Sequence, residues 1–353
     1  MRCTFTRLAT LAALAAPPIV PAALAAQGGS RYTLSGSAVA IYDLAGKVRL
    51  EAGSGSDVVV SVDRVGADAD KLRVLTGPIG GSTTLRVLFP ARRISYPGMR
   101  DNSSTTLRVN EDGTFGDEDD GGDRVTITGS GGGLEAGADL RIAVPRGKRV
   151  VLHLAVGDAA VANVDGDLTV NVNSADITVN GARGRLRLDG GSGNVRVSDV
   201  QAELDVDTGS GSVTVTGAKS DRVRLDTGSG GARVSNVEAS RLEIDVGSGS
   251  IDASAVRVPD VKLDAGSGSV DVALAGEIRN LDIDAGSGNV TVHVPASVGA
   301  ELSVETGSGG IRTDLPVQAT KLERDALVGK IGDGRGRIHI ETGSGGVRLL
   351  TQQ

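Results

Sequence analysis

The sequence has very few aromatic residues and no tryptophan. Aromatics make up 2% of the 353 residues, with three tyrosines and three phenylalanines. Valine, leucine, isoleucine and alanine must therefore supply nearly all the buried surface, and such a core suits closely spaced β-sheets. The shortage also argues against a polysaccharide-active enzyme, because sugar subsites favour aromatic platforms.

Cysteine is almost absent as well, and the single one lies near the N-terminus in a segment typical of a secretory signal peptide. Arg2 and Arg7 precede an apolar stretch at residues 8–20, and the small-x-small motif at residues 23–25 is a cleavage site. This stretch is shorter than a bilayer span and is interrupted by prolines, so a membrane anchor fits less well.

Residues 1–26 are therefore predicted to be a signal peptide, cleaved after Ala25 or Ala26. Cleavage removes Cys3, so the mature chain has neither disulfides nor thiolate chemistry. We expect an exported protein, located in the periplasm, on the outer surface or outside the cell. No later stretch is apolar enough to cross a membrane, so no transmembrane segment is expected in the mature chain.

The sequence also has fewer basic than acidic residues, 37 against 44. The net charge is −7, and loss of Arg2 and Arg7 with the signal peptide lowers it to −9. An acidic exported protein is not expected to bind nucleic acid. The expected partners are cell-surface or envelope components. No cofactor motif is present, so no cofactor is expected.

What the sequence has in abundance is glycine, 52 residues in all, much of it in a repeated Gly-Ser-Gly triplet. The steps between successive triplets of the main series are 18 to 21 residues, and a last copy follows after 36. An early copy begins at Gly53, and eroded versions lie at residues 173–175 and near 157–158. The main copies begin at Gly191, Gly209, Gly228, Gly247, Gly266, Gly286, Gly307 and Gly343. A fixed period of this length indicates a repeat architecture.

Apolar and polar residues alternate on both sides of each triplet, which is typical of strands, and helical spacing is almost absent. An antiparallel meander gives no reason for identical copies. A parallel β-solenoid does, because each residue then lies over its equivalent one coil earlier, at ~4.8 Å. We predict an all-β, single-stranded parallel β-solenoid (β-helix) with ~19-residue coils, the triplets forming tight corners. The usual crossover preference predicts a right-handed coil.

An acid lies two residues before each triplet, including Glu51 and Glu341 at the two outlying copies. In one interpretation each carboxylate accepts hydrogen bonds from the amides of its own corner. In the other, the stacked carboxylates form a cation-binding or ligand-binding column, because a bound cation would relieve their repulsion. Seven acids are predicted to form this column: Asp189, Asp207, Asp226, Asp245, Asp264, Asp284 and Glu305. No other metal site is predicted.

The chain divides into four parts by regularity. Signal peptide 1–26 is followed by an irregular N-terminal β region at 27–145, which contains a charged, solvated loop at 90–123. Regular coils occupy 146–312. Residues 313–353 are predicted to be an insertion and a capping coil that covers the exposed edge of the solenoid.

Three stretches carry a family resemblance: "ADLRIAVPRGKRVVLHLAVGDAAV", the series of "DxGSGSV"-like corners and the closing "VGKIGDGRGRIHIETGSGGVRL". They resemble the bacterial putative-adhesin domain family of unknown function, over roughly residues 36–350. The autotransporter-adhesin head domain is a second, weaker match. The resemblance implies repeated β-coils and a cell-envelope location, and says little about mechanism.

No catalytic constellation is apparent. The histidines, His153, His293 and His339, are not paired at metal-ligand spacing, and no G-x-S-x-G motif occurs. We therefore expect no catalytic residues and a structural or adhesive protein of the bacterial envelope. The alternative is a cation-binding or ligand-binding module that uses the acidic column, and a polysaccharide-active β-helix enzyme fits least well.

Overall fold

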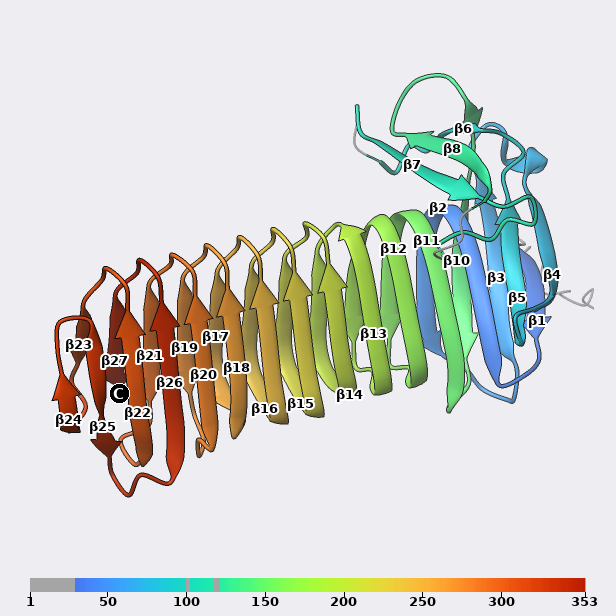
Figure 1. The fold of residues 1–353 in the computed structure, drawn as a ribbon. Helices are drawn as coiled ribbons and strands as arrows, with labels where there is room; N and C mark the ends of the chain where they lie inside the picture. Colours follow the sequence, from blue (N-terminus) through green and yellow to red (C-terminus); the bar gives the residue numbers. More distant parts are fainter. Residues whose placement is uncertain (1–28, 100–101, 117–120, 353) are drawn as a thin grey trace, which may run out of the picture.

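The computed structural model describes residues 29–99, 102–116 and 121–352, which form a long all-β molecule (Figure 1). The one helical turn in these ranges is η1 (Ala69–Lys71), so the expectation of essentially no helix is confirmed. The predicted signal peptide lies outside the described residues. No helix among the described residues is long and apolar enough to cross a membrane.

The strands fall into three groups along the chain. The N-terminal group is β1 (Ser30–Leu34), β2 (Ala38–Ala52), β3 (Val58–Val65), β4 (Arg73–Ile79), β5 (Ser82–Leu88), β6 (Arg93–Ser95), β7 (Ser104–Val109), β8 (Asp123–Thr128), β9 (Leu134–Glu135) and β10 (Gly137–Val144). The middle group is β11 (Lys148–Ala162), β12 (Asp165–Asn180), β13 (Arg183–Ser192), β14 (Val195–Thr208), β15 (Val213–Thr227), β16 (Ala232–Val246), β17 (Ile251–Arg257), β18 (Asp260–Ala265), β19 (Val270–Leu274), β20 (Asn280–Ala285) and β21 (Val290–Val294). The last group is β22 (Ala300–Thr306), β23 (Ile311–Thr313), β24 (Gln318–Leu322), β25 (Ala326–Ile331), β26 (Gly336–Thr342) and β27 (Val347–Thr351).

Strands of the middle group stack in parallel, one coil on the next (Figure 1). The register step is 18 residues between Leu186 and Leu204 and 20 between Val261 and Leu281. The parallel solenoid is therefore correct and the meander is excluded. The hand of the coil stays a prediction.

Each coil has two arms, so the solenoid has two facing sheets. We call the sheet formed by the arms before the Gly-Ser-Gly corners the first sheet, and the sheet formed by the arms after them the second. Alternate residues of both arms point between the sheets: Leu204 and Val206 before one corner and Val213 and Val215 after it are at most 1% exposed. This aliphatic core is the main source of stability.

The Gly-Ser-Gly corner exists because successive coils approach closely there. A Cβ atom on Gly211 would overlap the carbonyl oxygen of Gly193 one coil earlier. A left-handed backbone is not the general reason: among the corners from residue 191 onward, Gly193 alone has a positive φ, at +123°.

In the coils between residues 163 and 255, the opposite end turns through a left-handed residue that sequence reasoning missed. Asn163 (φ 55°), Asp199 (φ 51°) and Asn236 (φ 53°) occupy this turn, and glycines occupy it in the coils between them. Ala255 (φ 50°) occupies it one period after Asn236. Asparagine, aspartate and glycine tolerate this conformation best. Their alternation one period apart is the signal that could have revealed the turn.

The expected solvated loop at 90–123 is largely a folded lobe, which corrects the prediction. Its described residues supply β6 and β7, which join β8 and β9 in a separate four-stranded sheet (Figure 1). Ile94, Tyr96 and Phe115 form a second core with the outward side chains of β2 and β11. Apolar residues spaced among the charges, not the charges themselves, decide the structure of this segment.

The expected capping coil at the C-terminus is also wrong in its order. The last coil of the sequence, β26 and β27, lies between β20–β21 and β22–β23 rather than at the end of the solenoid. The insertion forms the cap instead, because β25 pairs antiparallel with β22 and β24 pairs antiparallel with β25 (Figure 1). Gly332 and Gly334, both with positive φ, make the tight return from β25 to β26.

Candidate functional site

The predicted acids do assemble into one column on the outward side of the first sheet. Each is in register with the next along the run Asp189, Asp207, Asp226, Asp245, Asp264 and Asp284. Glu341 follows Asp284, and Glu305 comes after Glu341, because β26 is inserted before β22. The acidic column thus has eight members, and Glu305 is the outermost.

Toward the N-terminal lobe the same column changes character. Asn171 lies in register with Asp189, followed by His153 and then Tyr42. The rings of Tyr42 and His153 are stacked with centroids 4.4 Å apart, and Phe115 of the lobe meets Tyr42 edge-on. The lobe therefore covers the start of the column, and the acids begin where this cover ends.

Glu51, the acid before the isolated early triplet, does not belong to the column. It lies on the second sheet, in register with Ala162, and forms an ion pair with Arg141 at 2.6 Å between Oε1 and Nε. The side-chain hydrogen bond from Arg141 lowers the pKa of Glu51. The true corner of this coil is at Gly46, in register with Gly157.

The acids do not serve their own corners, so that interpretation is wrong. Among the described residues, no backbone N–H of a Gly-Ser-Gly corner donates to a column carboxylate. Where the residue after the acid is threonine, its hydroxyl forms a hydrogen bond to the corner instead. The Thr208 hydroxyl donates to the Gly211 carbonyl oxygen at 3.0 Å, and the Thr227 hydroxyl donates to the Gly230 carbonyl oxygen at 2.5 Å. Both threonines face inward and are 1% exposed.

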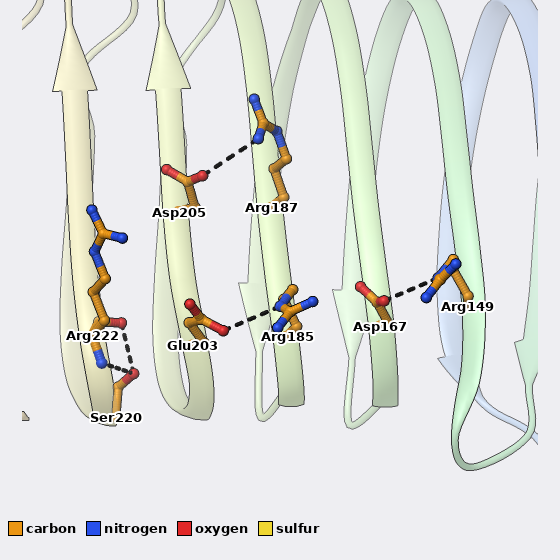
Figure 2. A network of polar contacts seen from close by, with 8 residues as sticks. All are labelled: Arg149, Asp167, Arg185, Arg187, Glu203, Asp205, Ser220 and Arg222. Carbon is orange, nitrogen blue, oxygen red and sulfur yellow. Dashed lines mark hydrogen bonds and ion pairs between the residues drawn. The ribbon is translucent and has the colours of Figure 1, made fainter.

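In the outward columns beside the acidic one, arginines of one coil form ion pairs with acids of the next coil (Figure 2). The pairs bring guanidinium and carboxylate groups of adjacent coils within 3.1 to 3.6 Å: Arg149–Asp167, Arg185–Glu203 and Arg187–Asp205. Arginine and acid thus alternate at the coil spacing, so charge along these columns largely cancels.

The acidic column has no such alternation. Asp226 is paired with Arg224 of its own strand at 3.2 Å, and Glu341 with His339 at 3.3 Å. Partial burial and then the flanking Asp226 and Asp189 raise the pKa of Asp207. Partial burial and like charge at the coil spacing therefore disfavour the ionised form of Asp207.

A resident metal centre is not apparent within the described ranges, where no three His, Cys, Asp or Glu side chains converge on a point that could hold a metal ion. The carboxylates of the acidic column lie along a line and do not surround a common centre. A cation would therefore lie between two coils and keep much of its water shell.

One arrangement resembles a hydrolytic triad. His339 lies in register between Asp282 and Ser303, within a groove of about 690 Å³ beside the cap. Its Nε2, however, faces Glu341 Oε1 at 3.3 Å, and no hydrogen bond joins it to Ser303 or Asp282 among the described residues. The relay that activates a serine is therefore not formed.

Fold and surface together define a two-sheet parallel β-solenoid with repeated outward columns. The model of the Toastrack DUF4097 family matches residues 138–350, more than half of the chain. The protein belongs to the Toastrack DUF4097 family, a domain family of unknown function. The resemblance to a bacterial domain family of unknown function is thus supported, and the resemblance to the autotransporter-adhesin head domain is not.

Two solved structures are similar at low identity. A putative cell adhesion protein from Clostridium sporogenes is 9% identical, with a TM-score of 0.21, covering 92% of this chain and 100% of that one. A putative lipid binding protein from Parabacteroides distasonis is 11% identical, with a TM-score of 0.40, covering 92% and 97%. Likeness of this degree carries no functional argument. Comparison with curated proteins finds no match.

Proposed function

We propose that the protein is an exported structural or adhesive β-solenoid of the bacterial cell envelope, without catalytic activity. The observation that carries this is the continuity of one aliphatic core through successive coils, with charge-paired columns on its surface. Such a core makes a stiff rod, since each coil is bonded to the next along its whole length. A stiff rod with a repeated surface suits spacing or adhesion.

Export is tested by fractionation. The full chain with a C-terminal tag is produced in a bacterium beside a variant lacking residues 1–26. The proposal expects the full chain in the periplasm, envelope or medium, shortened at Ala25 or Ala26, and the variant in the cytoplasm. Cytoplasmic retention of the full chain at full length would overturn it.

The envelope role is tested by deleting the gene and measuring surface attachment and resistance to detergent. Loss of either, restored by the full chain but not by the variant lacking residues 1–26, supports the proposal. Unchanged attachment and resistance would overturn the structural and adhesive role even if export were established.

A second candidate, cation binding by the acidic column, is favoured by the raised pKa values of two of its members, Asp207 and Asp245. Burial, then Asp264 and Asp226, raise the pKa of Asp245, so a divalent cation that neutralised the neighbours would stabilise the folded protein. Millimolar calcium should then raise the melting temperature by several degrees, less so in Asp245→Asn. Asp271→Asn, on the second sheet, is the matched control. No calcium-dependent shift would remove this candidate.

A further inference from the structure

The second sheet contains a hollow next to the cap whose lining carries no carboxylate. It measures about 220 Å³ and is lined by Asn289, Thr291, Gly310, Arg312, Gly346, Val347 and Arg348. Its polar side chains are two arginines, a threonine and an asparagine. This lining differs from the outward columns of the first sheet, where arginines such as Arg185 and Arg187 lie beside acids.

Chain topology brings these residues together. Thr291 on β21 is in register with Arg348 on β27, and Arg348 is in register with Arg312 on β23. All three point outward from successive strands. The hollow exists because β27 is inserted between β21 and β23, which are otherwise consecutive arms of the second sheet.

Arg312 and Arg348 are adjacent like charges at a spacing of ~4.8 Å between strands, and neither forms an ion pair with an acid among the described residues. Elsewhere such neighbours share an acid: Arg222 and Arg241 are also in register, and both contact Glu243, at 3.2 and 3.8 Å. No acid is present among the described residues that line the hollow, so none is shared by Arg312 and Arg348. An anion placed between the guanidinium groups would satisfy both.

The remaining groups are also donors. The Asn289 carbonyl oxygen Oδ1 accepts a hydrogen bond from the Gly346 N–H at 2.9 Å, which orients the side chain and leaves its amino group as a donor. The Thr291 hydroxyl adds a further donor. Four donor groups exceed what the two oxygens of a carboxylate need, and they suit an anion with three or four oxygens.

We propose that this hollow is a binding site for a tetrahedral oxyanion, the phosphate or sulfate class, either free or as the charged group of a larger ligand. Its volume is below the roughly 300–1,000 Å³ typical of sites that enclose a whole small molecule. The site therefore holds one charged group and leaves any substituent in solvent. This inference goes beyond the proposed function and does not depend on export.

The test measures binding of sodium phosphate and sodium sulfate by calorimetry at constant ionic strength, with acetate as the carboxylate comparison. Arg348→Gln and Arg312→Gln should each weaken phosphate binding by roughly tenfold, since each removes charge-assisted hydrogen bonds. Arg233→Gln is the matched control. Arg233 lies in the same outward column and is exposed, but pairs with Asp252 at 3.1 Å.

A second readout separates binding from folding. Without anion, Arg312→Gln should melt at or slightly above the wild-type temperature, because it removes like-charge repulsion. With phosphate, the wild type and Arg233→Gln should gain thermal stability, and the two hollow variants should gain little. Equal phosphate binding in all four proteins, or no saturable binding of phosphate or sulfate by the wild type, would overturn the proposal.

Binding of glycerol 3-phosphate distinguishes a site for the free ion from a site for the phosphate group of a larger ligand. Binding equal to that of inorganic phosphate means that the site accepts a phosphate group on a larger molecule. Exclusion of the ester with retention of phosphate means that the ligand is the free ion. Both results support the oxyanion site. Acetate binding as tight as phosphate binding would contradict the tetrahedral class.

Discussion

At the scale of single residues, the side chain that stabilises a Gly-Ser-Gly corner is the threonine that follows the repeated acid, not the acid itself. The repeated acid faces solvent, while the following position faces inward and holds threonine in several coils, as at Thr208, Thr227, Thr306 and Thr342. The hydroxyl reaches a corner carbonyl oxygen in each of these four cases. A buried carbonyl without a partner is costly, so the inward residue has the larger effect on stability.

Thr227→Val tests this directly. Val246 occupies the equivalent position one coil later, so valine fits the site. The variant should lose the hydrogen bond to Gly230 and about 1 kcal/mol of unfolding free energy, measured by urea unfolding. Thr214→Val on an outward position is the control and should change the free energy by less than about 0.5 kcal/mol. Equal effects would mean that the hydroxyl contributes nothing to the corner.

A second residue-scale feature is Asp43, which is fully buried at the corner of β2. Burial raises its pKa well above the ordinary value, the Ala45 backbone N–H lowers it in part, Asp139 raises it and Leu44 N–H lowers it. Neither carboxyl oxygen makes a well-aligned hydrogen bond. The folded protein therefore binds this proton more tightly than the unfolded chain does.

From this sign, the contribution of Asp43 to the unfolding free energy is fully present below pH 3.8 and is lost as pH rises through the folded-state pKa. Asp43→Asn cannot ionise, so its free energy of unfolding should rise relative to that of the wild type as the pH increases from about 4 to about 9. Urea unfolding at each pH measures this difference. Asp63→Asn is an exposed control. A difference between Asp43→Asn and wild type that is constant over pH would show that the carboxyl stays in one protonation state.

At the scale of the element, the corner is defined by distance between coils. Gly211 has no room for a side chain, because its Cβ would overlap the Gly193 carbonyl. Gly190, two residues before the Ser192 corner position, does have room: a Cβ there would lie 3.6 Å from Thr208 Cγ2, an ordinary contact. Glycine is thus required at one position and only tolerated at the other.

Gly211→Ala should therefore lose roughly 1–3 kcal/mol of unfolding free energy, the usual cost of overpacking. Gly190→Ala should be neutral or slightly stabilising, because alanine restricts the unfolded chain. Thermal and urea unfolding of the two variants gives the comparison. If Gly211→Ala were as stable as wild type, close coil stacking would not be the reason for the repeat.

At the scale of the whole molecule, strands β26 and β27 lie inside the solenoid rather than at its edge. β26 and β27 have neighbours on both sides, whereas β24 is paired on one edge and its five residues are all exposed. Leu322 of β24 is 73% exposed, and Lys321 lies beside it. A lysine on an edge strand discourages pairing with another chain, so this end closes the solenoid.

Hydrogen exchange should reveal this order. Amides of β27 should be protected as well as those of β21, although β27 lies at the C-terminus, and amides of β24 should exchange fastest among these three strands. Peptide-resolved mass spectrometry makes the measurement. Rapid exchange across β27 would mean that the last coil lies at the end of the solenoid.

The sequence by itself determined the class of fold and seven of the eight members of the acidic column, because period two and the period of about 19 residues are local properties of the chain. Glu341 joins the column only because β26 is inserted between β20 and β22. Facing was predictable for the same reason: Val215 is buried, as alternation requires. The family match and the parallel register agree with these inferences.

Only the tertiary structure decided which segments become neighbours when a connection is long. The lobe between β5 and β10 and the inserted coil β26–β27 both follow insertions, where the period is interrupted and strands from distant positions compete for the same edge. Packing resolves that competition: Ile94 and Phe115 cover the outward side of β2, and β27 enters beside β21. The pairing of Arg312 with Arg348 is a consequence of this order, since their separation of 36 residues becomes one strand spacing only after folding.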